Sequence, residues 1–225
     1  MPSILLIRHA QASFGAEDYD VLSLRGVEQV GALVDGLRER GIRADRVISG
    51  DLRRQRDTAG PCAQAVGLEV AVDSRWNEYD DRDILGHHAS VPAGLEHHAG
   101  DVELSSRQFQ DILNPALEAW IDAGAGGPCR ETWPRFRDRL EEALRELASS
   151  LGKGETAVVV SSGGAIAAVT VGLLGLPPRT LTDLNHVSIN AGITKLAVGR
   201  GGINVISVNE HAHLERPGGS LVTYR

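Results

Sequence analysis

The sequence predicts an α/β protein, a three-layer αβα sandwich with a mostly parallel central sheet. Apolar runs typical of strands alternate along the 225 residues with segments typical of amphipathic helices, and this alternation indicates a parallel sheet covered by helices on both faces. The run from Thr156 to Ser161 is apolar and β-branched, as expected of a central strand buried on both faces. A chain of this length forms one sizeable core, so we predict a single domain over residues 1–225.

The first half of the chain is expected to alternate strands and helices. The expected strands are Ile4 to Ile7, Val47 to Ile48, and Leu68 to Val72. Ser23 is the expected N-cap of a helix that continues to Arg40 and ends at Gly41. A second helix is expected from about Leu52 to Val66. The core-facing residues expected on the first helix are Val27, Val30, Leu33, Val34 and Leu37.

From Asp73 to about Ser105 the periodic pattern is lost. A segment this long without regular structure is usually functional or a lid, so we expect residues 73–105 to form a variable cap or loop insertion. Regular structure is expected to return as helices over Arg107 to Ala123, from Thr132 onward with Pro134 in the first turn and Phe136, Leu140, Leu144 and Leu147 as its apolar stripe, and over Ala165 to Leu174. A hairpin of Ser188 to Val198 with Ile203 to Val208 is expected to follow.

Composition indicates a cytoplasmic protein. The formal net charge of −7 argues against a general nucleic-acid binder. No apolar run approaches the roughly 20 residues of a membrane span, and the first run ends in Arg8 without a signal-peptide cleavage pattern. Cys62 and Cys129 stand in no metal or redox spacing, so reduced thiols are expected.

Candidate site residues follow four predicted strands. Arg8 and His9 come directly after the first strand, and ligands of open α/β sheets bind beyond the carboxyl ends of strands. After the second strand, Arg53, Arg54 and Arg56 stand at the opening of a helix, where free N–H groups and the helix dipole favour an anion such as phosphate. Taken alone, these arginines fit a solvated basic face better than a phosphate site.

The other two strand ends are weaker signals. Ser161 to Gly164 leads from a buried strand into a helix, and its glycines would let the backbone approach a ligand closely, although a tight turn with nothing bound has the same sequence. Glu78 follows the third strand at the start of the irregular segment, where a single Glu is more often a surface residue than a proton donor.

Taken together, these segments resemble the histidine phosphatase superfamily, the phosphoglycerate-mutase-like proteins. The opening Leu-Ile-Arg8-His9 with a small residue after it is similar to the family's Arg-His-Gly signature. The segment from Leu22 to Gln29 resembles its Leu-Thr-x-x-Gly-x-x-Gln motif. Asp51-Leu-Arg-Arg54-Gln-Arg-Asp-Thr58-Ala59 is similar to its Ser-x-Leu-x-Arg-Ala-x-x-Thr-Ala helix start. Glu78, the helix entry Glu131-Thr-Trp133 and the Val-Ser-x-Gly-Gly segment extend the resemblance over nearly the whole chain.

The resemblance implies a phosphoglycerate-mutase-like fold and a phosphoric monoester hydrolase. His9 would be the nucleophile that takes the phosphoryl group as phosphohistidine before water hydrolyses it. Arg8 and Arg54 would bind the phosphoryl oxygens, together with Ser162 and Gly163. Glu78 would act as general acid toward the leaving alkoxide and then as base toward water. No metal or cofactor is implied.

The largest departure from the family pattern is Ser162, which stands where the second catalytic His is expected. A serine hydroxyl is a neutral donor, and its hydrogen bond is weaker than one from a charged group, roughly 1 against 1.5 to 3 kcal/mol. We therefore expect a site with lower or altered activity, or one in which His186 or His213 moves in from another loop. Ala10 and Gly15 are smaller departures.

Three alternatives stay open at this point. The pairs His87-His88 and His97-His98 would suit a divalent metal, although residues of a cap would more often select the substrate. A mutase would return the phosphoryl group to a second position of its ligand. A non-catalytic pseudo-phosphatase would bind a small phosphate ester or inorganic phosphate without turnover. The C-terminal hairpin also offers an edge strand for a homodimer.

Overall fold

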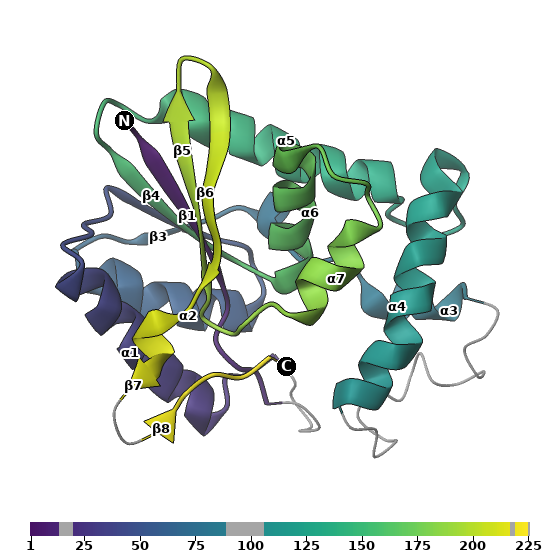
Figure 1. Ribbon diagram of the computed structural model, residues 1–225, viewed down its shortest axis with the longest axis horizontal. Helices are drawn as coiled ribbons and strands as arrows, with labels where there is room; N and C mark the ends of the chain where they lie inside the picture. Colours follow the sequence, from purple (N-terminus) through teal and green to yellow (C-terminus); the bar gives the residue numbers. More distant parts are fainter. Residues whose placement is uncertain (14–19, 89–105, 217–218, 225) are drawn as a thin grey trace.

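A computed structural model describes residues 1–13, 20–88, 106–216 and 219–224. Within these ranges a six-stranded sheet has the order β3-β2-β4-β1-β5-β6 (Figure 1). Its strands are β1 (Ser3–Arg8), β2 (Arg46–Ser49), β3 (Val70–Val72), β4 (Thr156–Ser161), β5 (Ile193–Gly199) and β6 (Gly202–Glu210). The first four in space, β3 to β1, are parallel, whereas β5 and β6 are antiparallel to their neighbours. The predicted mostly parallel α/β sheet is therefore confirmed.

Helices cover both faces of this sheet (Figure 1). The helices are α1 (Leu24–Glu39), α2 (Arg53–Gln64), α3 (Asp81–Gly86), α4 (Ser106–Ala123), α5 (Trp133–Ser150), α6 (Gly163–Leu174) and α7 (Thr180–His186). Short 3-10 turns are η1 (Ser74–Trp76), η3 (Gly124–Gly126) and η4 (Ala212–Leu214), and β7 (Glu215–Arg216) pairs with β8 (Gly219–Ser220). None of the helices in the described ranges is long and apolar enough to cross a membrane.

The alternation of side chains along β1 divides the interior into two cores. Leu5 and Ile7 pack with residues of α1 and α2, among them Leu33. Ile4 and Leu6 pack on the other face with residues of α4, α5 and α6. Because β1 is apolar at every one of these positions, both faces of the central strand are buried, which makes three layers.

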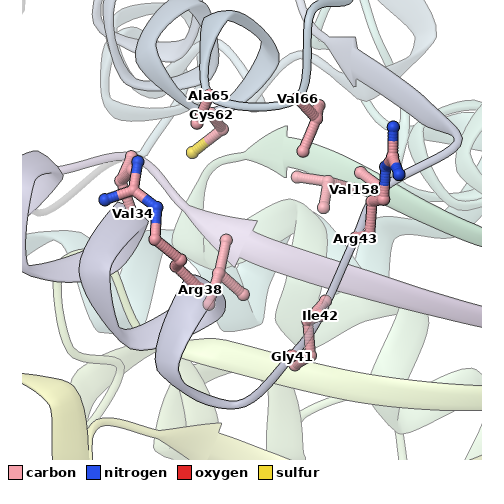
Figure 2. A pocket seen from close by; sticks show the side chains of 11 residues that line it. Val34, Arg38, Gly41, Ile42, Arg43, Cys62, Ala65, Val66 and Val158 are labelled. Atoms are coloured by element: carbon pink, nitrogen blue, oxygen red, sulfur yellow. The ribbon is translucent and has the colours of Figure 1, made fainter.

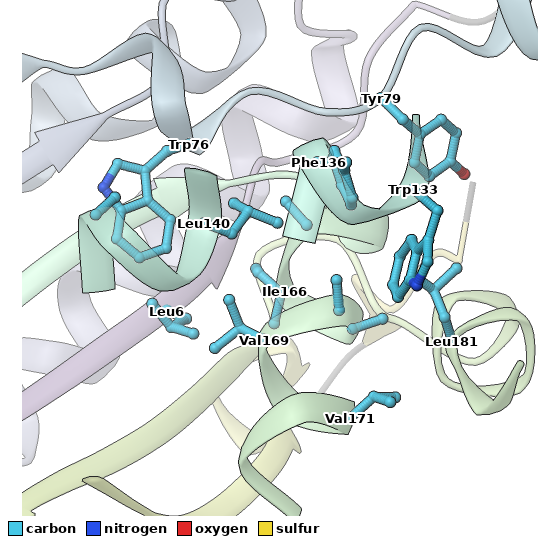
Figure 3. Close-up of a cluster of buried hydrophobic side chains, with 14 of the residues drawn as sticks. Leu6, Trp76, Tyr79, Trp133, Phe136, Leu140, Ile166, Val169, Val171 and Leu181 are labelled. Atoms are coloured by element: carbon cyan, nitrogen blue, oxygen red, sulfur yellow. The ribbon is translucent and has the colours of Figure 1, made fainter. Parts of the chain in front are cut away.

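The core on the α5 side includes an aromatic cluster of Tyr79, Trp120, Trp133 and Phe136. Neighbouring ring centroids lie 5.4 to 6.0 Å apart and several pairs meet edge to face, an arrangement worth about 0.5 to 1.5 kcal/mol per pair beyond area burial. Figure 3 shows Tyr79, Trp133 and Phe136 beside Leu140 and Ile166. The cluster ties the segment that carries Glu78 to α4 and α5.

The structure differs from the sequence-based expectations in four details. Val27 is 60% exposed, because the buried face of α1 runs through Gln29, Val30, Leu33 and Gly36 instead. The first strand of the hairpin begins at Ile193 rather than Ser188, and α7 was not predicted. Within 73–105 the structure has η1 and α3, while residues 89–105 lie outside the described ranges; the single domain with a cap stays a prediction.

Candidate active site

The carboxyl ends of β1, β2 and β4 bring the candidate residues to one edge of the sheet. Arg8 lies opposite Ser161 in the parallel pair of β1 and β4, so His9 and Ser162 leave the sheet side by side. Ser49, at the end of β2, pairs with Val160 of β4, and α2 begins four residues later. Parallel pairing thus gathers segments that are distant in the sequence.

His9 is buried and held in one orientation. Its backbone N–H donates to Ser161 O at 2.8 Å, and its carbonyl accepts from the Asn190 side chain at 3.2 Å. Nδ1 lies 2.8 Å from Ala10 O, and Nε2 lies 3.1 Å from Nε of Arg54. Because a guanidinium only donates and a carbonyl only accepts, the proton is on Nδ1 and the lone pair on Nε2. The lone pair of Nε2 therefore faces the Arg54 guanidinium.

Arg54 is shared between His9 and Asp20. Its Nη1 lies 2.6 Å from Oδ1 of Asp20, and the Asp20 carboxylate also accepts from the backbone N–H groups of Arg53 and Arg54, at 2.7 and 3.4 Å. The N-cap residue Leu52 has no polar side chain, so Asp20 caps α2 from outside the helix. An anion thus already occupies the start of α2.

Arg8 is also buried, on the other side of β1. Its Nη1 donates to the carbonyls of Ser188 and Tyr224, the latter at 2.5 Å. Gly163, the first residue of α6, lies beside the Arg8 side chain. These bonds bring the guanidinium, the start of α6 and the C-terminal segment to one place.

Glu78 contacts the first turn of α6. Its Oε2 accepts from the N–H of Gly164 at 2.8 Å, and its Oε1 accepts from the N–H of Tyr79 at 3.2 Å. A Cβ at Gly164 would lie 2.6 Å from Oε1 and 2.3 Å from the Tyr79 ring, so only glycine permits this approach. The structure therefore places Glu78 at the same sheet edge as His9.

The loop that carries Glu78 is held by Arg139 of α5. Arg139 Nη1 donates to the carbonyls of Arg75 and Asn77 at 2.7 and 2.8 Å. Its Nε and Nη2 form a bidentate pair with Glu131 at 2.6 and 3.0 Å, and its guanidinium lies 4.7 Å from the centroid of the Phe136 ring. The Arg139 side chain thus holds the backbone at Arg75 and Asn77, directly before Glu78.

Ser162 is bonded to a glutamine rather than to an imidazole. Its Oγ accepts from Nε2 of Gln55 at 2.9 Å. His213 lies on η4 against Gly36, with Nε2 3.0 Å from Ala191 O, and His186 is exposed at the end of α7.

Asp83, His87 and Cys129 offer ligand atoms within 4.8 Å of one another. Asp83 already accepts from the N–H and Nε of Arg130 at 2.8 and 3.2 Å, and Nδ1 of His87 lies 2.8 Å from Asp83 O. A metal would have to replace these bonds. His97 and His98 lie outside the described residues.

A separate cavity of about 350 Å³ lies between α1, α2 and β4, toward the other end of these helices. Figure 2 shows Cys62, Val66 and Val158 around it, with Arg38 from the last turn of α1 and Arg43 from the segment that follows α1. Its described lining contains neither imidazole nor carboxylate.

The sequence model of the histidine phosphatase superfamily, branch 1, matches residues 4–211. The chain belongs to the histidine phosphatase superfamily. Among similar members, the probable phosphoglycerate mutase GpmB of Serratia proteamaculans is 29% identical over 189 residues, which cover 79% of this chain and 77% of that protein.

Solved structures agree with this membership. A mycobacterial glucosyl-3-phosphoglycerate phosphatase with inorganic phosphate is 26% identical and superimposes with a TM-score of 0.65, covering 95% of this chain and 99% of its own. The phosphoserine phosphatase of Entamoeba histolytica in complex with phosphoserine has a TM-score of 0.66 at 20% identity, over 95% of this chain and all of its own. The latter likeness shows the shared fold.

Sequence reasoning missed three members of this histidine phosphatase site: Asp20, Gln55 and Arg139. Asp20 stands in a polar loop with no distinguishing spacing. Arg139 is one of several arginines of the predicted helix, and nothing in its spacing sets it apart from the others. Gln55 departs from the family's helix-start motif, which has Ala at the position after the arginine that corresponds to Arg54. This departure was a signal that the sequence offered.

Proposed function

We propose that the chain is a phosphatase that hydrolyses a small-molecule phosphate monoester through a phosphohistidine on His9. The observation that carries the proposal is the buried imidazole with its proton on Nδ1 and its lone pair on Nε2, next to a guanidinium. Such a nitrogen is ready to attack phosphorus without first losing a proton.

In the first step His9 Nε2 forms a bond to phosphorus while the ester P–O bond breaks. Glu78, in its protonated form, gives a proton to the leaving oxygen. Positive charge develops on the imidazole, and the Nδ1–H bond to Ala10 O becomes charge-assisted and stronger. Arg54 turns its N–H groups from Nε2 to the phosphoryl oxygens, where Arg8, the Gly163 N–H and the Ser162 hydroxyl complete the binding site.

In the second step water attacks phosphorus, and the P–N bond breaks. Glu78, now a carboxylate, takes the proton from water, so that inorganic phosphate leaves and both residues return to their starting forms. Neither a metal nor a cofactor takes part. The Gly164 N–H and the Tyr79 N–H support the carboxylate in this base role.

The decisive experiment measures phosphate release from p-nitrophenyl phosphate and a panel of sugar phosphates. His9→Ala should lower the rate at least 10³-fold and abolish an acid-labile phosphoenzyme, whereas His211→Ala, at an imidazole bonded to Asn209 O, should leave it unchanged. An unaltered rate in His9→Ala would refute the proposal.

The second candidate is phosphoryl transfer of the mutase type, favoured by the names of the GpmB relatives. A mutase would require a bisphosphate primer and would conserve total ester. A pseudo-phosphatase would show a phosphate-induced thermal shift with no release.

The proposal carries three further predictions about the protein: a cytoplasmic location, no nucleic-acid partner, and a homodimer. For the homodimer, the edge strand β6 exposes Ile206 and Val208, and an apolar edge strand favours pairing between copies.

A further inference from the structure

Two of the residues that depart from the family motifs at this edge are bonded to each other. Ser162 stands where the second histidine is expected, and Gln55 stands where the helix-start motif has Ala after the arginine. Gln55 Nε2 donates to Ser162 Oγ at 2.9 Å across 107 positions of sequence. Gln55 on α2, which is larger than the Ala of the motif, therefore contacts Ser162 at the start of α6, which is smaller than the expected His.

Gly50 is a third departure from the family motif, and it lies beside the Gln55 side chain. Counting back from Leu52 and Arg54, the motif places its Ser at position 50, which is glycine here. A Cβ at Gly50 would lie 2.0 Å from Oε1 of Gln55 and 2.4 Å from Oδ1 of Asn77. Gly50 thus makes room for the amide, and the three departures form one packing arrangement.

Burial makes this arrangement tight. The Gln55 side chain is fully buried and Ser162 is 1% exposed. Because Ser162 Oγ is already within hydrogen-bonding distance of the amide, an imidazole on the same Cβ would extend into the volume that Gln55 fills. The space expected for the second histidine is occupied by the glutamine.

The direction of the bond determines what Ser162 can do. Nε2 of Gln55 also lies 3.4 Å from Trp76 O, which orients the nitrogen toward Ser162, so Oγ accepts. Within the described ranges Oγ neither caps α6 nor donates to another protein group. Its proton is available at the end of β4, beside His9.

We infer that Gln55 and Ser162 act as one unit in place of the second histidine. Gln55 is a positioning residue that holds Ser162 so that its hydroxyl donates to a phosphoryl oxygen. This inference rests on the proposed function. It adds a consequence for pH dependence, since the unit contains no group that titrates near neutral pH.

A double-mutant cycle tests the unit. Gln55→Met keeps the volume but removes the donor, and Ser162→Ala removes the hydroxyl. Each should lower kcat about tenfold with KM within about twofold, and the double variant should be no worse than either single one, because both remove the same interaction. Thr182→Ala removes a buried hydroxyl that donates to Arg179 O, and should lower Tm without changing kcat.

A repacking series tests the steric part. Ser162→His alone should lose activity and Tm, whereas Gly50→Ser/Gln55→Ala/Ser162→His should recover activity at least tenfold over that single variant and add an ionisation near neutral pH to the kcat profile. Ser162→His as active as the triple variant would overturn the inference, as would losses that multiply in the cycle.

The phosphatase activity and the Gln55–Ser162 unit can be tested independently of each other. If the wild-type chain released no phosphate, or if His9→Ala kept the rate, the phosphatase proposal would be wrong. The same cycle would then be scored on the Kd for inorganic phosphate from thermal shift, where coupled losses support the unit and independent losses overturn it.

Discussion

Arg54 Nε lies 3.1 Å from Nε2 of His9, and Nη1 of the same guanidinium lies 2.6 Å from the Asp20 carboxylate. A fixed planar fork makes both contacts from one side chain. The guanidinium of Arg54 therefore couples His9, which we propose as the nucleophile, to the Asp20 carboxylate.

Replacing the Arg54 guanidinium with an ammonium group tests this coupling. Arg54→Lys keeps the charge but cannot bond His9 and Asp20 in the same geometry, so kcat should fall about 10²-fold, similar to the loss of one preorganised donor. Steady-state kinetics measure it. Arg56→Lys, at an exposed position on the same helix, is the matched control and should be silent.

Removing the negative charge of Asp20 should strengthen phosphate binding. Asp20→Asn deletes the negative charge beside Arg54, so affinity for inorganic phosphate should rise several-fold, most clearly at low ionic strength. Asn keeps a side-chain oxygen that can accept from the Arg53 N–H, and Asn and Asp cap helices about equally well, so the free energy of unfolding should change little. Calorimetric titration with phosphate checks the first effect. Asp57→Asn, on the exposed side of α2, controls for general charge, and weaker phosphate binding in Asp20→Asn would contradict the prediction.

The anchor of the Glu78 loop should matter for turnover more than for binding. Arg139→Ala releases the carbonyls of Arg75 and Asn77 and leaves Glu131 unpaired, so kcat should fall at least tenfold, with a smaller change in KM and a lower Tm. Arg137→Ala removes a neighbouring arginine paired with Asp138 and should change neither constant. Equal kinetics in the two variants would exclude a positioning role for Arg139.

Acid stability should depend on Asp73. The hydrogen bond from Arg75 holds the pKa of the Asp73 carboxyl below its usual range. A lowered folded-state pKa stabilises the fold above the unfolded value, about 3.9, and this contribution is lost as pH falls through the folded value. Asp73→Asn should therefore cost about 1 kcal/mol at pH 7 in urea titrations, and this cost should shrink progressively as pH falls through the folded-state pKa. A cost that persisted at low pH would assign the effect to packing.

The Cys62 thiol should be unreactive in the folded protein. Burial raises its pKa to about 12, although it borders the cavity of Figure 2, and thiolate is the reactive form. Labelling with a disulfide reagent at pH 8 should be slow until urea unfolds the chain. Cys62→Ser identifies the signal, and rapid labelling without denaturant would show that the cavity admits the reagent.

Local features of the chain were readable because their physical causes lie within a few residues. Ser23 caps α1 by accepting from the Gly26 N–H at 3.0 Å, as its position before an apolar stripe predicted. The strands β1 and β4 are buried on both faces, as their uninterrupted apolar runs predicted. The edge that gathers His9 and Arg54 follows from parallel pairing, which the alternation of elements predicted.

By itself, the sequence determined the αβα layers, the parallel sheet and the strand ends that carry polar residues, since periodicity and capping act over one or two turns. Tertiary structure alone decided that Asp20 caps α2, that Arg139 anchors the Glu78 loop, and that Gln55 fills the space beside Ser162. These contacts join segments up to 107 positions apart, and their geometry depends on how helices pack over the sheet, which no local pattern encodes.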